Sequence, residues 1–264
     1  MAIVTGATTG IGAATARALH AAGYHVFGTY RKLPTAKIPG VHYVACDVTS
    51  DQSVGTAVSE VHAKAGRIDL LVNNAGVGLV GAAEESSLEQ TRSIFDVNLF
   101  GMIRMTIAVL PVMRQQRSGR IVNISSVMGL IPSPFMALYA SSKHAVEGYS
   151  QSLDHEVRAS GIRVVLVEPG YTRTTFESNA LSADQKGEHY ALARANAEAV
   201  LRNEIAKADP PEVVAATVVT AATAATPRLR YTAGRDAATI SLLRRFVPTS
   251  AFDKSLRKRM QMPA

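Results

Sequence analysis

This sequence of 264 residues is poor in several residue types: it has no tryptophan and only one cysteine. Because Cys46 stands alone, no disulfide can form within the chain, and we expect a reducing, cytoplasmic compartment with Cys46 as a small core residue. We find no apolar stretch of the ~18 residues that a transmembrane helix needs, so no integral membrane segment is predicted. The seven histidines show no metal-ligand spacing, and no metal site is expected.

Charged residues are also scarce, at 19% of the chain, yet their balance is basic, with a formal net charge of +7. Many of the cations fall in the last forty residues: Arg228, Arg230, Arg235, Arg244, Arg245, Lys254, Arg257, Lys258 and Arg259. A solvated basic surface accounts for them without any partner. Binding to nucleic acid or to a membrane surface would require a continuous patch, which a sequence does not show, so we predict no nucleic-acid partner.

Hydrophobic residues make up 47% of the sequence, enough for one large core. Short apolar runs predict buried strands at Ala2–Thr5, Tyr24–Thr29, Val41–Cys46, Asp69–Val72, Arg120–Ile124 and Ile162–Val167, with a last one at Leu229–Thr232. Helical patterns lie between them, at Ala13–Ala22, Asp51–Ala65, Ser87–Arg117, Tyr139–Ala159 and Pro210–Ala225. This alternation predicts an α/β protein with a doubly wound parallel sheet, the three-layer Rossmann fold, as a single domain over residues 1–264.

Two parts of the chain depart from the alternation. The polar segment from about Thr172 to Asp209 has helical propensity and no strand pattern, and its place after a strand end indicates a substrate lid. The tail, from about residue 235 to 264, contains apolar residues such as Leu242, Phe246 and Phe252. We therefore expect the tail to pack either on its own chain or on a neighbour.

A glycine-rich loop with the spacing Gly6-x-x-x-Gly10-x-Gly12 follows the first predicted strand. Glycines let the backbone approach a pyrophosphate closely, and the N-terminus of the next helix offers N–H groups and a positive dipole end. A carboxylate after the second strand would bind the ribose 2′-hydroxyl of NAD, but Arg31 and Lys32 stand there instead. Two cations at this point favour a 2′-phosphate. The sequence therefore predicts NADP(H), with NAD(H) as the alternative.

Tyr139 and Lys143 are four residues apart, which places them one turn apart on the same face of a helix. A free tyrosine hydroxyl titrates near ~10, and a fixed ammonium beside it favours the phenolate and lowers that pKa. Such a pair can donate and accept a proton near neutral pH. The same spacing also fits the start of an ordinary amphipathic helix, so the other motifs must decide.

Seven motifs occur in order: Thr5-Gly6-x-x-x-Gly10-Ile11-Gly12, Asp47-Val48, Asn73-Asn74-Ala75-Gly76, Asn98, Ser126, Tyr139-x-x-x-Lys143 and Pro169-Gly170. Together they closely resemble the short-chain dehydrogenase/reductase family over residues 1 to about 235. The resemblance implies that Ser126 holds the substrate oxygen, Tyr139 transfers the proton and Lys143 binds the nicotinamide ribose. Asn98 would hold a water in a proton relay. The implied cofactor-binding set is Gly6, Thr8, Thr9, Gly10, Ile11, Gly12, Arg31, Asp47, Val48, Asn74, Gly76, Tyr139, Lys143, Pro169, Gly170, Thr172 and Thr174.

Within this resemblance, Ser126 is chosen over Ser125 because the catalytic serine of the family commonly precedes the tyrosine by 13 positions, as Ser126 does. The tail resembles that of relatives acting on steroid-like or retinoid-like alcohols and ketones. The implied activity is NADP(H)-dependent hydride transfer to or from a ketone or secondary alcohol, with Tyr139 as general acid/base, in a homodimer or homotetramer. The alternatives are a catalytically silent nicotinamide-binding sensor or scaffold, and a sugar-nucleotide epimerase or dehydratase, whose relatives have a larger C-terminal domain.

Overall fold

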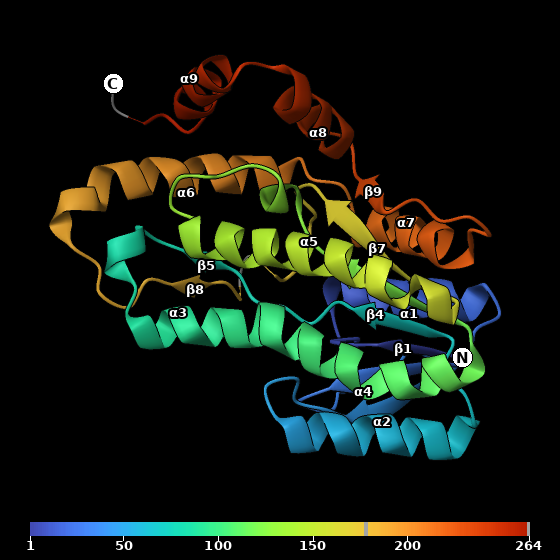
Figure 1. The fold of residues 1–264 in the computed structure, drawn as a ribbon. Helices are drawn as coiled ribbons and strands as arrows, with labels where there is room; N and C mark the ends of the chain where they lie inside the picture. Colours follow the sequence, from blue (N-terminus) through green and yellow to red (C-terminus); the bar gives the residue numbers. More distant parts are fainter. Residues whose placement is uncertain (177–178, 263–264) are drawn as a thin grey trace.

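The computed structural model describes residues 1–176 and 179–262, which form a seven-stranded parallel sheet between two layers of helices (Figure 1). Its strands are β1 (Ala2–Val4), β2 (Val26–Tyr30), β3 (Val41–Ala45), β4 (Leu70–Asn73), β6 (Gly119–Ile124), β7 (Ile162–Pro169) and β9 (Arg230–Ala233). Their order, β3-β2-β1-β4-β6-β7-β9, confirms the predicted doubly wound sheet in one domain. The order reverses between β1 and β4, which creates a crevice at the carboxyl ends of these strands.

Both faces of the sheet are buried, because successive residues of a strand point to opposite faces. In β1, Ile3 packs into the core on one face, whereas Ala2 and Val4 pack into the core on the other. The first face is covered by α2 (Asp51–Ala65), α4 (Gly101–Gln116) and α5 (Ala137–Val157). The second is covered by α1 (Gly10–Ala21) and α7 (Pro211–Thr223).

Helix boundaries follow local signals in the chain. Ser50 caps α2 by accepting a hydrogen bond from the first turn, and Gly66 ends it in the left-handed conformation. By contrast, α1 begins at Gly10 rather than at the predicted Ala13, so the last glycines of the loop form its first turn. The helix α5 begins two residues before the predicted start at Tyr139. These shifts place the first turn of each helix beside the crevice.

The longest helical run joins α3 (Leu88–Phe95) to α4 through a π-helical turn, Asp96–Phe100. The 29 residues Leu88–Gln116 are long and apolar enough to cross a membrane, by length and composition alone. The expectation that no stretch reaches this length is therefore wrong. In the fold the run packs against α2, α5, β4 and β6, and core helices of globular proteins pass the same test.

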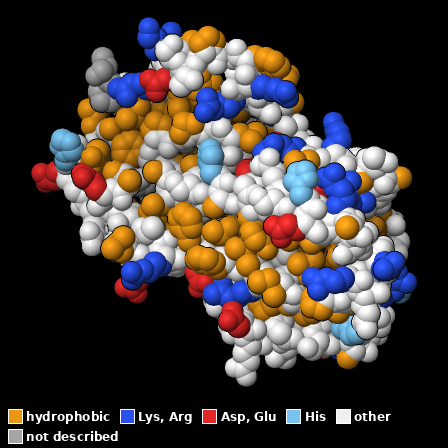
Figure 2. Space-filling view, viewed as in Figure 1, with side chains coloured by type: hydrophobic (Ala, Val, Ile, Leu, Met, Phe, Trp, Pro, Cys, Tyr) orange, Lys and Arg blue, Asp and Glu red, His pale blue; other side chains and the backbone are white. Residues whose placement is uncertain are grey.

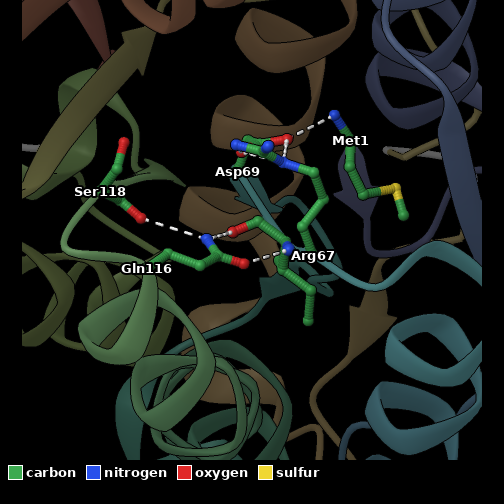
Figure 3. Close-up of polar contacts among 6 residues, drawn as sticks. Met1, Arg67, Asp69, Gln116 and Ser118 are labelled. Carbon is green, nitrogen blue, oxygen red and sulfur yellow. Dashed lines mark hydrogen bonds and ion pairs between the residues drawn. The ribbon is translucent and has the colours of Figure 1, made fainter.

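At the amino end of β4, side chains tie the sheet to its surroundings (Figure 3). Asp69 accepts hydrogen bonds from the Met1 amino group at 2.8 Å and from Arg67 at 2.6 Å. Gln116 accepts a bond from the Ile68 N–H at 2.8 Å and donates one to the Ile68 carbonyl at 2.8 Å. These contacts stabilise the end of the sheet opposite the crevice.

Contrary to the prediction, the segment from Thr172 to Asp209 contains a strand. Its β8 (Leu181–Ser182) pairs in parallel with β5 (Leu79–Val80), and two residues are too few to leave a periodic pattern in the sequence. The helical propensity is realised in α6 (Ala191–Ala206). A β-bridge between Thr172 and Asp209 closes the segment at its base.

The tail folds as two helices, α8 (Ala237–Phe246) and α9 (Thr249–Arg259), at one edge of the molecule (Figure 1). Ala237 packs in a cluster with Tyr139, and Met260 packs in a cluster with Val200 of α6. Of the two expected places, the tail thus packs on its own chain.

Candidate active site

A cleft of about 650 Å³ opens at the carboxyl ends of the strands. It is lined by residues that follow β1, β2, β3, β4, β6 and β7, together with the first turns of α1 and α5. Of the predicted site residues, all except Asn98 line it: Gly6, Thr8, Thr9, Gly10, Ile11, Gly12, Arg31, Asp47, Val48, Asn74, Gly76, Ser126, Tyr139, Lys143, Pro169, Gly170, Thr172 and Thr174. The fold therefore gathers motifs from across the chain into one site.

At Gly12 the glycine loop lies so close to Gly6 and Asn74 that no side chain has room. A Cβ on Gly12 would lie 2.1 Å from the Gly6 carbonyl oxygen and 2.4 Å from Asn74 Nδ2. Gly6 has a φ of 63°, which side chains disfavour. Thr5 Oγ1 accepts a bond from the Asn74 N–H at 2.8 Å, and Asn74 Nδ2 donates to the Thr5 carbonyl at 2.8 Å. This bare backbone at the N-terminus of a helix fits a pyrophosphate.

The Asn74 side chain therefore supports the loop from behind. These hydrogen bonds do not test the predicted contact of Asn74 with the adenine-side ribose, which stays a prediction. The sequence motif did contain Thr5, but no role was assigned to this residue. Its side chain turns out to be buried and to bridge the two strand ends, since Thr5 Oγ1 also accepts the Ala75 N–H at 2.9 Å.

Two cations lie where β2 ends. Arg31 and Lys32 line the cleft, and both are exposed. Nearby, the Asp47 carboxylate accepts bonds from the Thr49 N–H at 2.9 Å and from its hydroxyl at 2.7 Å. These bonds, with a smaller contribution from the charge of Arg31, hold the pKa of Asp47 below its usual range. The end of β2 thus offers positive charge and no carboxylate of its own.

Tyr139 and Lys143 occupy successive turns of α5, and both are buried. Lys143 Nζ donates to the Ile124 carbonyl at 2.9 Å and lies 5.7 Å from the centroid of the Tyr139 ring. Burial lowers the pKa of Lys143 to about 8, while the negative charge of Glu147 acts in the opposite sense. An amine with this pKa is mostly protonated at neutral pH, so a positive charge is fixed beside Tyr139.

Two serines follow β6 and line the cleft. Ser126 Oγ accepts a bond from the Met128 N–H at 3.1 Å and so caps a short 3₁₀ turn, Val127–Gly129. A hydroxyl that accepts such a bond can still donate its own proton to a ligand. Ser125 is buried, and within the described residues its Oγ has no hydrogen-bond partner. Both serines line the cleft, and the choice of Ser126 stays a prediction.

Asn98 lies behind the cleft, in the π-helical turn between α3 and α4. Its Oδ1 accepts the Val77 N–H at 2.8 Å, and its Nδ2 donates to the Val77 carbonyl at 3.0 Å and to Ser142 Oγ at 3.1 Å. A Cβ on Gly76 would lie 3.2 Å from Asn98 Oδ1 and 3.9 Å from Lys143 Nζ. Asn98 and Lys143 thus both lie close to the same glycine. Asn98 is a buried amide bonded to the backbone, and its water-holding role stays a prediction.

Sequence reasoning missed the apolar wall of the cleft, which consists of Val80, Met128, Met136, Phe176 and Leu201, among others. These residues come from short strands, turns and α6, and none belongs to a motif. The ring of Phe176 lies 5.9 Å from the ring of Tyr139, centroid to centroid. The one available signal was position, since Phe176 and Leu201 fall in the segment expected to form a lid.

Polar contacts hold this segment against the body of the protein. Glu85 forms a buried ion pair with Arg194 of α6, and it also accepts the Gly187 N–H at 2.8 Å. Ser87 donates a hydrogen bond to Asp184 at 2.6 Å. Thr172, Phe176 and Leu201 of this segment line the cleft, so the segment forms part of its wall.

The fold and the site together define a dinucleotide-binding protein, and comparison with known proteins gives the family. Residues 1–185 match the family model of the short chain dehydrogenases. A 3-ketodihydrosphingosine reductase of Bacteroides thetaiotaomicron is 42% identical over 71% of this chain and 69% of its own length. The uncharacterized oxidoreductase YusZ of Bacillus subtilis is 35% identical over 98% of both chains. The chain belongs to the short-chain dehydrogenase/reductase family.

Solved structures agree with this assignment. A short-chain dehydrogenase from Streptomyces avermitilis has a TM-score of 0.82 and 32% identity, over 98% of this chain and 94% of that one. A serine dehydrogenase in complex with NADP⁺ has a TM-score of 0.76 and 27% identity, over 89% and 94% of the two chains. The protein is an NAD(P)-dependent oxidoreductase that acts on CH–OH or related groups.

Proposed function

We propose that the protein transfers a hydride between NADP(H) and a ketone or secondary alcohol, with Tyr139 as general acid and base. The observation that carries this proposal is the buried ammonium of Lys143, fixed by the Ile124 carbonyl one turn away from Tyr139. Ser126 lines the same cleft. When bound, the nicotinamide supplies or accepts the hydride, and the chain supplies everything else.

In the direction of reduction, the Tyr139 hydroxyl donates its proton to the substrate oxygen as negative charge develops there. Ser126 donates a hydrogen bond to the same oxygen and stabilises that charge. The Lys143 ammonium stabilises the tyrosinate that remains. Asn98 holds a water beside Lys143, through which a proton returns to the site. Oxidation of an alcohol follows the same steps in reverse.

The preference for NADP(H) rests on Arg31 and Lys32, whose cations stand where a carboxylate would repel a 2′-phosphate. The serine dehydrogenase that resembles this chain binds NADP⁺, which supports the same choice. Two cations with no carboxylate at the end of β2 suit a doubly charged phosphate better than a ribose hydroxyl.

For the substrate we propose a ketone with a long apolar portion, because Met136 and Phe176 pack near Tyr139 and Leu201 lines the same cleft. The relative described as a 3-ketodihydrosphingosine reductase acts on such a molecule, as its name states. We further propose that the segment 172–209 acts as the substrate lid, and that the protein works as a cytoplasmic homodimer or homotetramer. A screen of NADPH oxidation over small diketones, acyl thioesters, steroids, retinals, quinones and long-chain 3-ketoamines identifies the class.

The proposed role of Tyr139 is tested by replacing it with Phe. We expect turnover to fall by about 10²–10⁴-fold, the usual contribution of a general acid–base group, while NADPH still binds. Tyr149→Phe is the matched control, because Tyr149 lies on the same helix but does not line the cleft. Retained turnover in Tyr139→Phe would exclude proton transfer by this residue. A wild-type protein that binds NADPH and turns over none of these ketones would favour the silent sensor.

A further inference from the structure

The C-terminal helices expose an unusual combination of side chains. Of the nine large hydrophobic residues that are exposed in the described part of the chain, three lie within five positions of α8. Leu242 is 59% exposed, Leu243 is 46% exposed and Phe246 is 72% exposed. Exposed apolar residues are ordinary when they are scattered, but a cluster on one helix marks a surface that contacts something.

The inner face of α8 is already occupied. Ala237 is fully buried, and Ile240 packs in the cluster that contains Tyr139. Arg244 donates a hydrogen bond to the Leu130 carbonyl at 3.3 Å. Leu242 and Phe246 are four residues apart and project from the opposite side of the helix. The apolar face of α8 is therefore separate from the packing that holds the helix in place.

The two tail helices are rich in cations. Between residues 237 and 262 there are six Lys and Arg residues and one acid, Asp253. Among these cations, Arg244 is engaged within the chain with the Leu130 carbonyl and Arg259 with Glu204. Arg245 lies over the ring of Phe246, with its guanidinium carbon 5.6 Å from the ring centroid. In α9, Phe252 and Leu256 are half-buried, and Leu256 packs with Met260, which follows the helix, in the cluster of Val200. Lys254 and Lys258 lie on the other side of the helix and are exposed. Figure 2 shows blue and orange side chains intermingled at this edge of the molecule.

We propose that α8 and α9 form a docking surface for an anionic lipid bilayer, with Leu242, Leu243 and Phe246 entering the interface and Arg245, Lys254 and Lys258 contacting lipid phosphates. An amphipathic helix with aromatic and leucine side chains on one face and cations at its margin binds membranes in this way. A nucleic acid would engage the cations but leave the apolar residues in water. A second copy of this chain, docked symmetrically, would bring two strongly basic surfaces together. Charge complementarity therefore selects the anionic bilayer.

The surface also lies close to the site. The inner face of α8 belongs to the cluster of Tyr139 and Met128, so one helix separates the bilayer contact from the cleft. The docking surface is independent of the proposed chemistry, because none of its apolar residues lines the cleft.

Co-sedimentation with vesicles tests the proposal. The purified full chain is mixed with vesicles of phosphatidylcholine alone, or with about one-third phosphatidylglycerol. We expect binding at least about tenfold stronger with the anionic vesicles, and weaker binding as salt is raised. The double variant Leu242→Ser/Phe246→Ser should lose about tenfold or more of that binding. The matched control is Leu88→Ser/Ile107→Ser, since these residues are equally exposed but lie far along the chain on α3 and α4.

Thermal unfolding of each variant verifies that the fold is kept. The proposal is overturned if the chain ignores anionic vesicles, or if the double variant binds them as well as the wild type. It is also overturned if both double variants lose binding alike, because that would point to a general apolar effect. Light scattering that shows a wild-type dimer and a monomeric Leu242→Ser/Phe246→Ser variant would assign the surface to a second copy instead.

Discussion

The glycine loop offers the sharpest test of the site, because two glycines in helices of this protein have opposite surroundings. Gly12 lies in the first turn of α1, where a Cβ would meet the Gly6 carbonyl oxygen at 2.1 Å. Gly55 lies in α2, where a Cβ would meet nothing within 4 Å. Both have ordinary helical backbone, so Gly→Ala has the same intrinsic effect at each site. The difference between the two variants then measures the close approach in the loop.

The expected magnitudes follow from this geometry. Replacing a helical glycine by alanine stabilises a helix by about 0.5–1 kcal/mol, so Gly55→Ala should raise the free energy of unfolding by that amount. Gly12→Ala gains the same helix stabilisation but must move a backbone carbonyl by about 1 Å. Such overpacking costs about 1–3 kcal/mol. A change of 1 kcal/mol shifts the melting temperature by about 2–4 °C in a chain of this size. We therefore expect Gly55→Ala to melt several degrees above Gly12→Ala.

Cofactor binding provides the second measurement. The displaced carbonyl belongs to the loop that should hold the pyrophosphate, so Gly12→Ala should weaken NADPH binding by about tenfold or more, with fluorescence titration as the assay. Gly55→Ala should bind NADPH like the wild type. If Gly12→Ala melts as high as Gly55→Ala and also binds NADPH normally, the close approach is not a requirement of the loop, and the reasoning fails.

Two further predictions concern charge. Arg31→Asp should weaken the binding of NADPH by about 1–3 kcal/mol more than the binding of NADH, because it replaces a phosphate partner by a like charge. Equal losses of affinity for both cofactors would refute the phosphate role. Burial raises the pKa of Glu168 from 4.5 to about 7, helped by Glu147 and opposed by Arg230. A raised carboxyl pKa stabilises the fold below pH 4.5, and that stability is lost as the pH rises through 7. Glu168→Gln cannot ionise, so across this window it should gain about 3 kcal/mol relative to the wild type, as measured by urea unfolding at each pH. The surface control Glu60→Gln should show no such gain.

The order of strands and helices could be predicted because strands buried on both faces appear as apolar runs, and helices appear as amphipathic stretches between them. The cleft could be located because the motifs follow strand ends, which meet at one edge of a parallel sheet. Contacts between residues far apart in the sequence could not be predicted. The pair β5–β8 has two residues per strand, and nothing local marks Glu85 and Arg194 as partners. Arg230, which reads as one more surface cation, instead lies 2.9 Å from Glu147 and from Glu168.

The Tyr-Lys pattern shows why geometry had to be added to spacing. A lysine one turn from a tyrosine changes the tyrosine little if its ammonium is mobile and hydrated, because water screens the charge. In this fold Lys143 is buried, and the Ile124 carbonyl holds its Nζ. Burial strengthens its field at Tyr139, but the same burial lowers the pKa of Lys143 toward the point where the charge would be lost at neutral pH. Glu147, one further turn along α5, opposes that loss with its negative charge. Tyr139 therefore depends on two features of Lys143. Its burial leaves the charge unscreened by water, and its acidic neighbour Glu147 favours the protonated form.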